Sequence, residues 1–305
     1  MKLNFGIKPL EYDLLRLLTN HEKRKSLQTL VAIFERAQEF GFQHFEIAWD
    51  YRYALPNLVT EARIAELAEF KDDNNVTFTL HAPIWGGIEL ASHVEKVRRA
   101  SVDILIDSLQ TSKELKPERM VIHLSGEFAN NLSSLNPLKE NHALELIISS
   151  MEKSLTEIIS KSGKSPNFFS IENIEFPLDI FLNIVRNKKA KLCLDTGHFL
   201  AGTKQASAED LDLMNFLRSY LDEIDVIHAH DGGIFWHKSG NFLPDDHRAL
   251  GNGIIPWKDM VAHLIDQKFS NPIIFQLTLA DAKQSLELIA NEFPDAVGEE
   301  FGIIR

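Results

Sequence analysis

The chain has a single cysteine and no long hydrophobic run, and both absences narrow what it can be. Cys193 is the only cysteine in 305 residues, which excludes an internal disulfide and fits a reducing compartment. No apolar stretch reaches the roughly 20 residues of a membrane span. The N-terminal sequence MKLNFGIKPLEYDLL also lacks the apolar segment of a signal peptide. We therefore expect a cytoplasmic protein with no membrane partner.

Basic residues are scarce relative to acidic ones. There are 32 Lys and Arg against 44 Asp and Glu, which gives a formal net charge of −12. Such a field repels polyanions, so duplex DNA is not an expected partner. The hydrophobic content of 44% is ordinary for a globular protein with a large core.

Apolar strands alternate with amphipathic helices along the whole chain, and no change in composition marks a linker. Strands are predicted at Leu3 to Ile7, His44 to Ala48, Val76 to His81, Met120 to His123, Phe168 to Glu172, Lys191 to Asp195, Val226 to His230 and Ile273 to Leu277. The first strand is not followed by the glycine fingerprint of an open, doubly wound sheet. The pattern predicts one α/β domain over residues 1–305, a (β/α)₈ TIM barrel with a long functional loop at Gly232 to Gly253 after the seventh strand.

Polar side chains recur where these predicted strands end. Because side chains alternate along a strand, one inward face carries potential ligands, namely His81, His123, Glu172, Asp195, His228 and His230. His198 follows Asp195 by three residues. Each could alone be a helix cap or a surface group, but burying so many ionisable groups without a counter-ion is costly. The pattern predicts a divalent metal such as zinc, iron or manganese at the carboxyl ends of the strands.

The ordered motifs resemble those of a known superfamily. They are LHAP at His81, VIHLSG at His123, IENI at Glu172, LDTGHFLAG at Asp195 and His198, VIHAHD at His228, and DDHRALGNG at Asp245 and His247. Together they resemble the xylose isomerase-like barrels, and within these the endonuclease IV (apurinic endonuclease family 2) branch. The resemblance implies two or three divalent metals per chain, preferably zinc, with manganese or iron as alternatives. One would bind His81, His123 and Glu172; a second Glu172, Asp195 and His228; a third His198, Asp245 and His247.

Two positions depart from the family pattern. Gln276 stands where the family ends its eighth strand on glutamate, and the isomerases and epimerases of the superfamily need that second carboxylate to move a proton. Gln276 can still bind a metal or orient water through its carbonyl oxygen. His230 stands where the endonucleases usually have asparagine, and is a candidate ligand, proton donor or support for a ligand. We take Glu172 and His230 as the candidate catalytic residues.

Aromatic and basic side chains are expected at the barrel mouth. Trp49, Trp85 and Trp236 each follow a predicted strand, and positive charge could come from Lys8, Arg52, Lys238 or Arg248. The basic run HEKRK at His21 to Lys25 is typical of a solvated helix end. We expect Trp85, Trp236 and Arg248 to contact a small anionic substrate.

The function expected from these residues is hydrolysis of a small phosphodiester at a di- or trinuclear metal centre. The motif ENIEFP, with LDTGH, IHAHDG and DDHRAL, also resembles the cobamide-remodelling phosphodiesterases, which cleave the nucleotide loop of corrinoids. Two alternatives stay open: a sugar or sugar-phosphate isomerase or epimerase, and a barrel that binds metal and ligand without catalysis.

Overall fold

A computed structural model describes residues 1–9, 29–126, 129, 142–174, 176–202, 212–236 and 242–298. Within these ranges, the side chains at 143, 200–202, 233–236 and 242–246 are not described. No helix among the described residues has the length and apolar character needed to cross a membrane.

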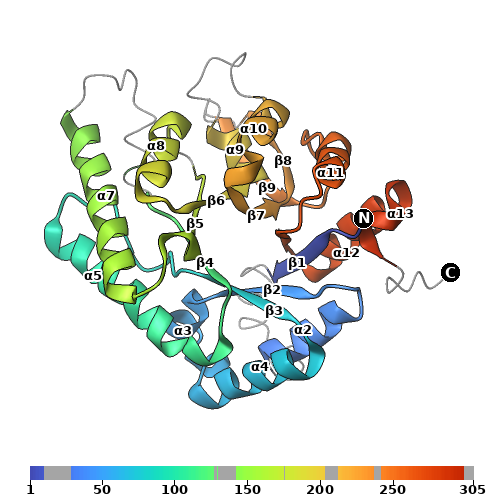
Figure 1. Cartoon of the computed structure of the whole chain (residues 1–305), viewed down its shortest axis with the longest axis horizontal. Coiled ribbons are helices and arrows are strands. Elements are labelled where there is room, and N and C mark those ends of the chain that lie inside the picture. Colours follow the sequence, from blue (N-terminus) through green and yellow to red (C-terminus); the bar gives the residue numbers. More distant parts are fainter. Residues whose placement is uncertain are drawn as a thin grey trace.

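Eight parallel strands close into a barrel, as the sequence predicts (Figure 1). Their order around the barrel is β1, β10, β7, β6, β5, β4, β3, β2, so β10 closes the ring against β1. The strands are β1 (Asn4–Pro9), β2 (His44–Ala48), β3 (Thr77–His81), β4 (Arg119–Ile122), β5 (Phe169–Glu172), β6 (Lys191–Asp195), β7 (Ile224–Ala229) and β10 (Pro272–Leu277). The predicted strands agree with these to within about two residues at each end.

Helices surround the barrel and cover its outer face (Figure 1). The longer ones are α2 (Leu30–Gln38), α4 (Glu61–Asn74), α5 (Glu95–Thr111), α7 (His142–Ser162), α8 (Leu178–Lys188), α10 (Leu213–Tyr220), α11 (Trp257–Asp266) and α12 (Leu279–Glu292). The short ones are α3 (Asp50–Ala54), α9 (Thr196–Gly202) and α13 (Pro294–Val297). Thr29, Thr60, Asp212 and Thr278 each accept a hydrogen bond from a first-turn backbone N–H, which explains where α2, α4, α10 and α12 begin.

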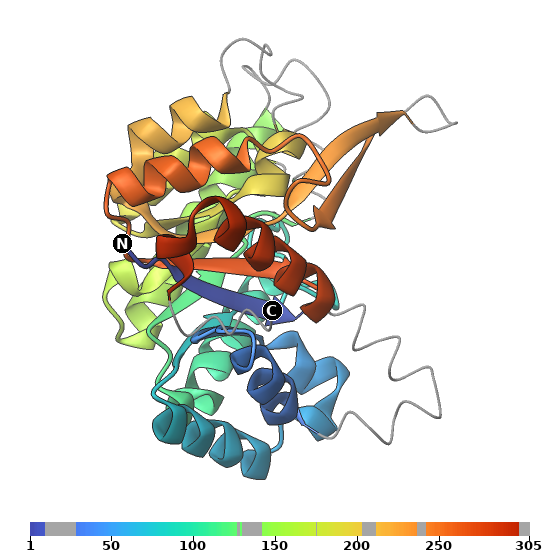
Figure 2. The same cartoon turned by 90° about the vertical axis from the view of Figure 1, so that its right-hand side faces the viewer.

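The connection predicted as a long loop after the seventh strand contains an antiparallel hairpin, β8 (Asp231–Trp236) and β9 (Phe242–Arg248). Figure 2 shows the two strands projecting from the body of the barrel. Asp231 fixes the base of this hairpin, because its carboxylate accepts hydrogen bonds from the backbone N–H groups of Gly232, Gly251 and Ile255 at 2.8–3.0 Å. A buried carboxylate with three such partners holds the returning chain close to the end of β7.

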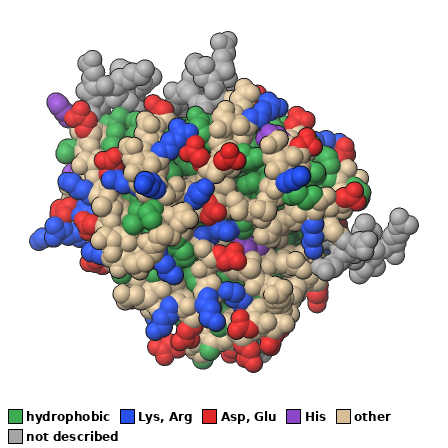
Figure 3. Space-filling view, in the orientation of Figure 1, with side chains coloured by type: hydrophobic (Ala, Val, Ile, Leu, Met, Phe, Trp, Pro, Cys, Tyr) green, Lys and Arg blue, Asp and Glu red, His purple; other side chains and the backbone are tan. Residues whose placement is uncertain are grey.

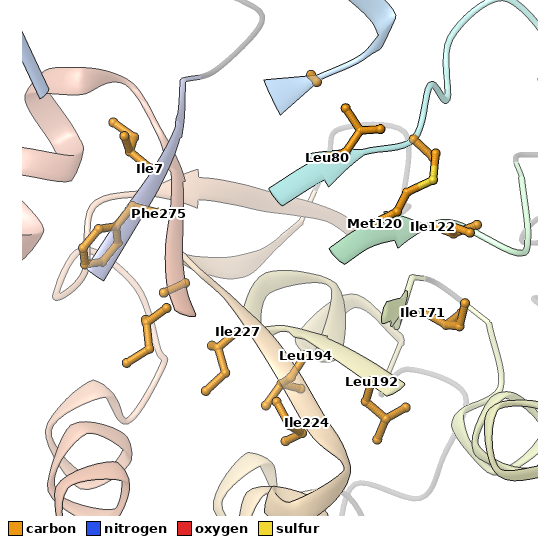
Figure 4. Packing of buried hydrophobic residues seen from close by; sticks show 14 of the residues in the cluster. Ile7, Leu80, Met120, Ile122, Ile171, Leu192, Leu194, Ile224, Ile227 and Phe275 are labelled. Carbon is orange, nitrogen blue, oxygen red and sulfur yellow. The ribbon is translucent and has the colours of Figure 1, made fainter. Parts of the chain in front are cut away.

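Outward-facing apolar side chains pack the strands against the helices. Figure 4 shows Leu192 and Leu194 of β6 and Ile227 of β7 in this layer, and all three are buried. The opposite faces point into the barrel, where Val121, Cys193, Val226 and Ile274 form a small separate apolar layer. This layer separates the polar groups at the two ends of the barrel interior.

At the amino ends of the strands, His44 fills the interior. Its Nδ1 and Nε2 lie 2.6 Å and 2.7 Å from the hydroxyls of Thr77 and Thr79, and the ring is fully buried. Burial, followed by the charge of Arg119, lowers the pKa of His44 from 6.5 to about 3. The neutral imidazole therefore closes this end, which leaves the carboxyl ends of the strands for a site.

Candidate metal centre

Buried ionisable side chains converge at the carboxyl ends of the strands. His81 ends β3, His123 follows β4, Glu172 ends β5, Asp195 ends β6, and His228 lies near the end of β7. All but His123 have 1% or less of their surface exposed. The sequence prediction that alternation brings these side chains together is correct for these five residues.

Glu172 lies at the middle of this cluster. A single oxygen, Oε2, is 3.3 Å from His81 Nε2, 2.9 Å from His123 Nε2 and 3.3 Å from His228 Nδ1. A carboxylate oxygen has about two lone-pair sites, so three imidazole nitrogens exceed what hydrogen bonding alone can satisfy. Burial acts to raise the pKa of Glu172, but His123 and His228 lower it well below 4.5, so the group is a carboxylate.

The hydrogen-bond partner of Nδ1 determines the tautomer of His81. Nδ1 lies 2.9 Å from the backbone carbonyl of Ala82, which can only accept, so Nδ1 carries the hydrogen and donates it. In the neutral ring Nε2 then presents a lone pair toward the Glu172 carboxylate. Two electron-rich atoms facing each other in a buried site indicate room for a cation, and a histidine tied to a carbonyl through its far nitrogen is typical of metal ligands.

His228 is arranged in the same way by a residue that the sequence interpretation does not include. Its Nε2 lies 3.1 Å from the carboxylate of Glu46 on β2, and both side chains are buried. Glu46 therefore orients His228 so that Nδ1 faces Glu172. Burial lowers the pKa of His228, but Cys193, Glu46 and Glu172 raise it well above 6.5, so the surroundings favour positive charge here.

Asp195 is held by the chain around it. Asn173 clamps its peptide, accepting from Asp195 N at 2.7 Å and donating to Asp195 O at 3.0 Å. One carboxylate oxygen accepts from the backbone N–H of His198 at 2.7 Å, so Asp195 also caps α9. The side chain of His198 has a buried Nδ1 without a hydrogen-bond partner, an orphaned atom that a metal would satisfy.

His230 uses both of its nitrogens within the protein. Nε2 donates to the Asp195 carboxylate at 3.0 Å, and Nδ1 accepts the backbone N–H of His247 at 3.0 Å. Of the roles that the sequence leaves open, this geometry favours support of Asp195. Its ring lies against Gly197, where a Cβ would come within 2.0 Å of His230 Cε1, so only glycine fits there.

The third predicted metal group is only partly described. His247 stacks on His230 with ring centroids 4.2 Å apart, and its centroid is 6.3 Å from that of His198. The backbone of Asp245 pairs with Gly233 in the hairpin, but its side chain lies outside the described part of the structure. The group formed by His198, Asp245 and His247 therefore stays a prediction.

Three groups of potential ligands are present among the described residues. They are His81, His123 and Glu172; Glu172, Cys193 and His228; and Glu172, Asp195 and His198, and in each group the ligand atoms lie within 4.8 Å of one another. Glu172 belongs to all three groups. The donor set is nitrogen, carboxylate oxygen and one sulfur, which suits zinc and neighbouring divalent metals.

Gln276 on β10 borders the centre, as expected. Its amide Nε2 lies 2.7 Å from His228 Nδ1, and its Oε1 lies 3.3 Å from His247 Nε2. Only 3% of its surface is exposed. A rotation of the amide by half a turn would direct its oxygen, in place of its nitrogen, toward the space shared with His228.

The barrel mouth differs in part from the sequence expectation. Trp49 is completely buried at the start of α3, so it is packing and not a stacking surface. Trp85 is half-buried, and its backbone N–H donates to Asp50 at 2.7 Å. Arg248 is half-buried at the end of β9. The side chain of Trp236, residue Lys238 and the run His21 to Lys25 lie outside the described residues.

Lys8 contributes positive charge inside the barrel. It is 6% exposed on β1, in register with Gln276, and its charge acts on Glu46. The buried carboxylates Glu46, Glu172 and Asp195 outnumber this lysine, even when His228 carries a proton. Buried negative charge of this kind needs a counter-ion, so the chain's residues fit divalent cations. The face of the molecule in Figure 3 shows acidic and basic side chains interspersed.

Comparison with known proteins decides the family. A family model described as the xylose isomerase-like TIM barrel matches residues 34–292. The chain belongs to this family.

Relatives within and around the xylose isomerase-like barrels differ in their described activity. The uncharacterised protein MJ1311 of Methanocaldococcus jannaschii is 25% identical over 90% of this chain and 87% of its own length. A probable endonuclease 4 of Sulfurihydrogenibium sp. is 26% identical over 61% of this chain and 67% of its own. The crystal structure of a D-tagatose 3-epimerase-like protein superposes with a TM-score of 0.65 at 21% identity, covering 96% of this chain and 98% of that one. The family is mostly enzymatic, and its reactions include both hydrolysis and epimerisation.

Proposed function

We propose that this xylose isomerase-like barrel is a divalent-metal-dependent hydrolase that acts on a small phosphodiester. The observation that carries the proposal is the convergence of three imidazole nitrogens on Glu172 Oε2. His81, His123, Glu172, Asp195, His198 and His228 would hold the metals, with Gln276 and His247 at their border. Divalent ions in such a site activate water and neutralise charge that develops on the oxygens of the group under attack.

The chain's own residues would prepare that site in two ways. Ala82 O and Glu46 fix the tautomers of His81 and His228, so that each presents a lone pair to the centre. His230 and Asn173 hold Asp195 in place, which limits the reorganisation needed when a substrate binds. Half-buried Trp85 and Arg248 would contact the substrate, Arg248 through the phosphate.

Epimerisation is the competing reaction within the family, and Gln276 argues against it. Deprotonation next to a carbonyl on one face and reprotonation on the other need two groups that exchange protons. A glutamine amide cannot take a proton near neutral pH. The sequence relationship to a probable endonuclease 4 at 26% identity supports the hydrolytic alternative. The net charge of −12 supports a small substrate over a DNA duplex.

Phosphorus NMR on a panel of substrates tests the proposal. Zinc- and manganese-loaded protein is incubated with small phosphodiesters, corrinoids that carry a nucleotide loop, and abasic DNA. We expect a new phosphomonoester resonance with a small phosphodiester, the corrinoid being our preferred candidate, and none with Glu172→Gln. In parallel, ketoses and keto-sugar phosphates are incubated in deuterated water.

The outcomes separate three functions. Deuterium in recovered sugar without phosphodiester cleavage would show an isomerase or epimerase and overturn the proposal. Metal binding with neither reaction would identify a binding barrel and also overturn it. Cleavage of abasic DNA alone would keep the hydrolase but refute the small substrate.

A further inference from the structure

We propose that the centre contains a sulfur-ligated metal position, formed by Cys193 together with Glu172 and His228. The expectation from the family motifs is an all-nitrogen-and-oxygen centre in which Asp195 is the ligand from β6. Cys193 precedes Asp195 by two residues on the same inward face of β6, so its thiol lies deeper in the barrel. The inference rests on metal binding, as proposed above, but not on the reaction.

The geometry of the three donors supports the proposal. Their ligand atoms lie within 4.8 Å of one another, and each comes from a different strand, β5, β6 or β7. The pairings place Glu172 level with Cys193, whereas His228 pairs with Asp195, two residues farther along β6. The ring of His228 nevertheless brings one of its nitrogens within 4.8 Å of the Cys193 sulfur. Glu172 and His228 are 3.3 Å apart, a spacing that two ligands of one zinc ion commonly have.

The orientation of His228 supplies an independent reason. Glu46 engages Nε2 at 3.1 Å, so in the neutral ring it is Nδ1 that presents its lone pair to the interior. Around Nδ1 lie the amide nitrogen of Gln276 at 2.7 Å and the anionic oxygens of Glu172 at 3.3 Å and Asp195 at 3.8 Å. One nitrogen of His228 also lies within 4.8 Å of the Cys193 sulfur. A cation bound to Nδ1 would replace the Gln276 amide hydrogen as the partner of this lone pair and would be attracted by both carboxylates.

The types of donor atom at this position also suit zinc. Gln276 borders the same space from β10 and brings no charge, so any ligand oxygen that it offers is neutral. Zinc binding would displace the proton of the Cys193 thiol, and thiolate is a preferred ligand of zinc.

The alternative is that Cys193 is only a small apolar residue. It belongs to the buried layer with Val121, Val226 and Ile274, where a thiol packs as well as a methyl group. The two roles differ in the metal's coordination sphere, which can be measured without any assay of activity.

X-ray absorption at the zinc edge is the decisive measurement on the full chain. Zinc–sulfur distances are about 2.3 Å and zinc–nitrogen distances about 2.0–2.1 Å, so a sulfur shell is resolved directly. We expect that shell in the wild type, its loss in Cys193→Ser and Cys193→Ala, and at least a tenfold lower affinity for one metal equivalent. Cobalt-loaded wild type should also show thiolate-to-metal absorption bands that both variants lack.

Val226→Ala is the matched control, because it opens the same interior layer without removing sulfur. It should keep the sulfur shell, and circular dichroism checks that all variants fold. A fully loaded wild type with only nitrogen and oxygen ligands would overturn the inference and leave the hydrolase proposal intact. A sulfur shell without phosphodiester cleavage would support the inference and overturn the hydrolase proposal. A wild type that binds no metal would overturn both.

Discussion

Substitution of Glu172 by glutamine tests the centre most directly, because this carboxylate belongs to all three ligand groups found among the described residues. Glu172→Gln keeps the size of the side chain but removes its charge and one acceptor oxygen. The three imidazole nitrogens within 3.3 Å of Oε2 would then face a neutral amide. We expect each group to lose its shared ligand and to bind metal at least a hundredfold more weakly. Mutation of a residue that only supports a ligand lowers metal affinity by about 10- to 100-fold, so loss of the ligand itself should cost at least the upper value.

The size of the effect follows from linkage between binding and folding. Zinc at a free concentration of about one hundred times its dissociation constant stabilises the folded state by about 2.7 kcal/mol per site. A hundredfold loss of affinity reduces this increment to about 0.4 kcal/mol at the same zinc concentration. In a domain of this size the difference corresponds to roughly 4 °C in melting temperature.

The assay compares unfolding of wild type and Glu172→Gln in chelator and at the same free zinc concentration. For each variant, the quantity to compare is the difference in stability between zinc and chelator. Any effect of the substitution on the metal-free fold cancels in this difference. Glu287→Gln, an exposed position on α12, is the control and should keep the full increment. An equal increment in wild type and Glu172→Gln would refute the placement of the centre at Glu172.

Three further predictions concern Gln276, His247 and His44. Gln276→Glu should tighten metal binding and keep hydrolysis within about tenfold, a barrier change of about 1.4 kcal/mol; gained sugar isomerisation in a variant whose parent lacks both activities would contradict the hydrolase. His247→Ala should remove about one metal equivalent by elemental analysis if His247 is a ligand; unchanged metal content would make it only the ring stacked on His230. The pKa of His44 is about 3 in the folded protein against 6.5 for an unperturbed histidine, so the unfolded chain binds the extra proton between these values. Stability from His44 is therefore complete above pH 6.5 and should fall by about 2 kcal/mol by pH 5; a urea titration in which His44→Gln shows the same fall would contradict this.

The sequence predicts the barrel well because one signal repeats eight times. Each strand is short, apolar on its outward face and followed by an amphipathic helix, so errors are confined to the ends of elements. The short helix α9 is not predicted, since LDTGHFLAG offers no full helical period after Asp195. The hairpin of β8 and β9 is not predicted either, because its glycines and aspartates are equally typical of a loop.

Within the site, alternation predicts which face a residue occupies but not how deep it lies or what it contacts. Trp49 directly follows a strand, as an exposed stacking residue would, yet it begins α3 and is fully buried. Glu46 carries the same signal as the metal ligands, since it alternates with Phe45 and Ile47 in HFEIA. It is absent from the predicted ligands because it lies two residues before the end of its strand.

The partnership of Glu46 with His228 shows why such contacts cannot be predicted from the sequence. The two residues are 182 positions apart and lie on strands that are not neighbours, so their contact crosses the barrel interior. Closure of the barrel is what brings β2 opposite β7, and only then does a carboxylate decide which nitrogen of His228 faces Glu172. Motifs identify the side chains that can bind a metal, whereas the tautomers that let them bind depend on contacts such as Glu46 to His228 and Ala82 O to His81. The reactivity of the centre is thus set by the fold as a whole, even though most of its ligands can be predicted one strand at a time.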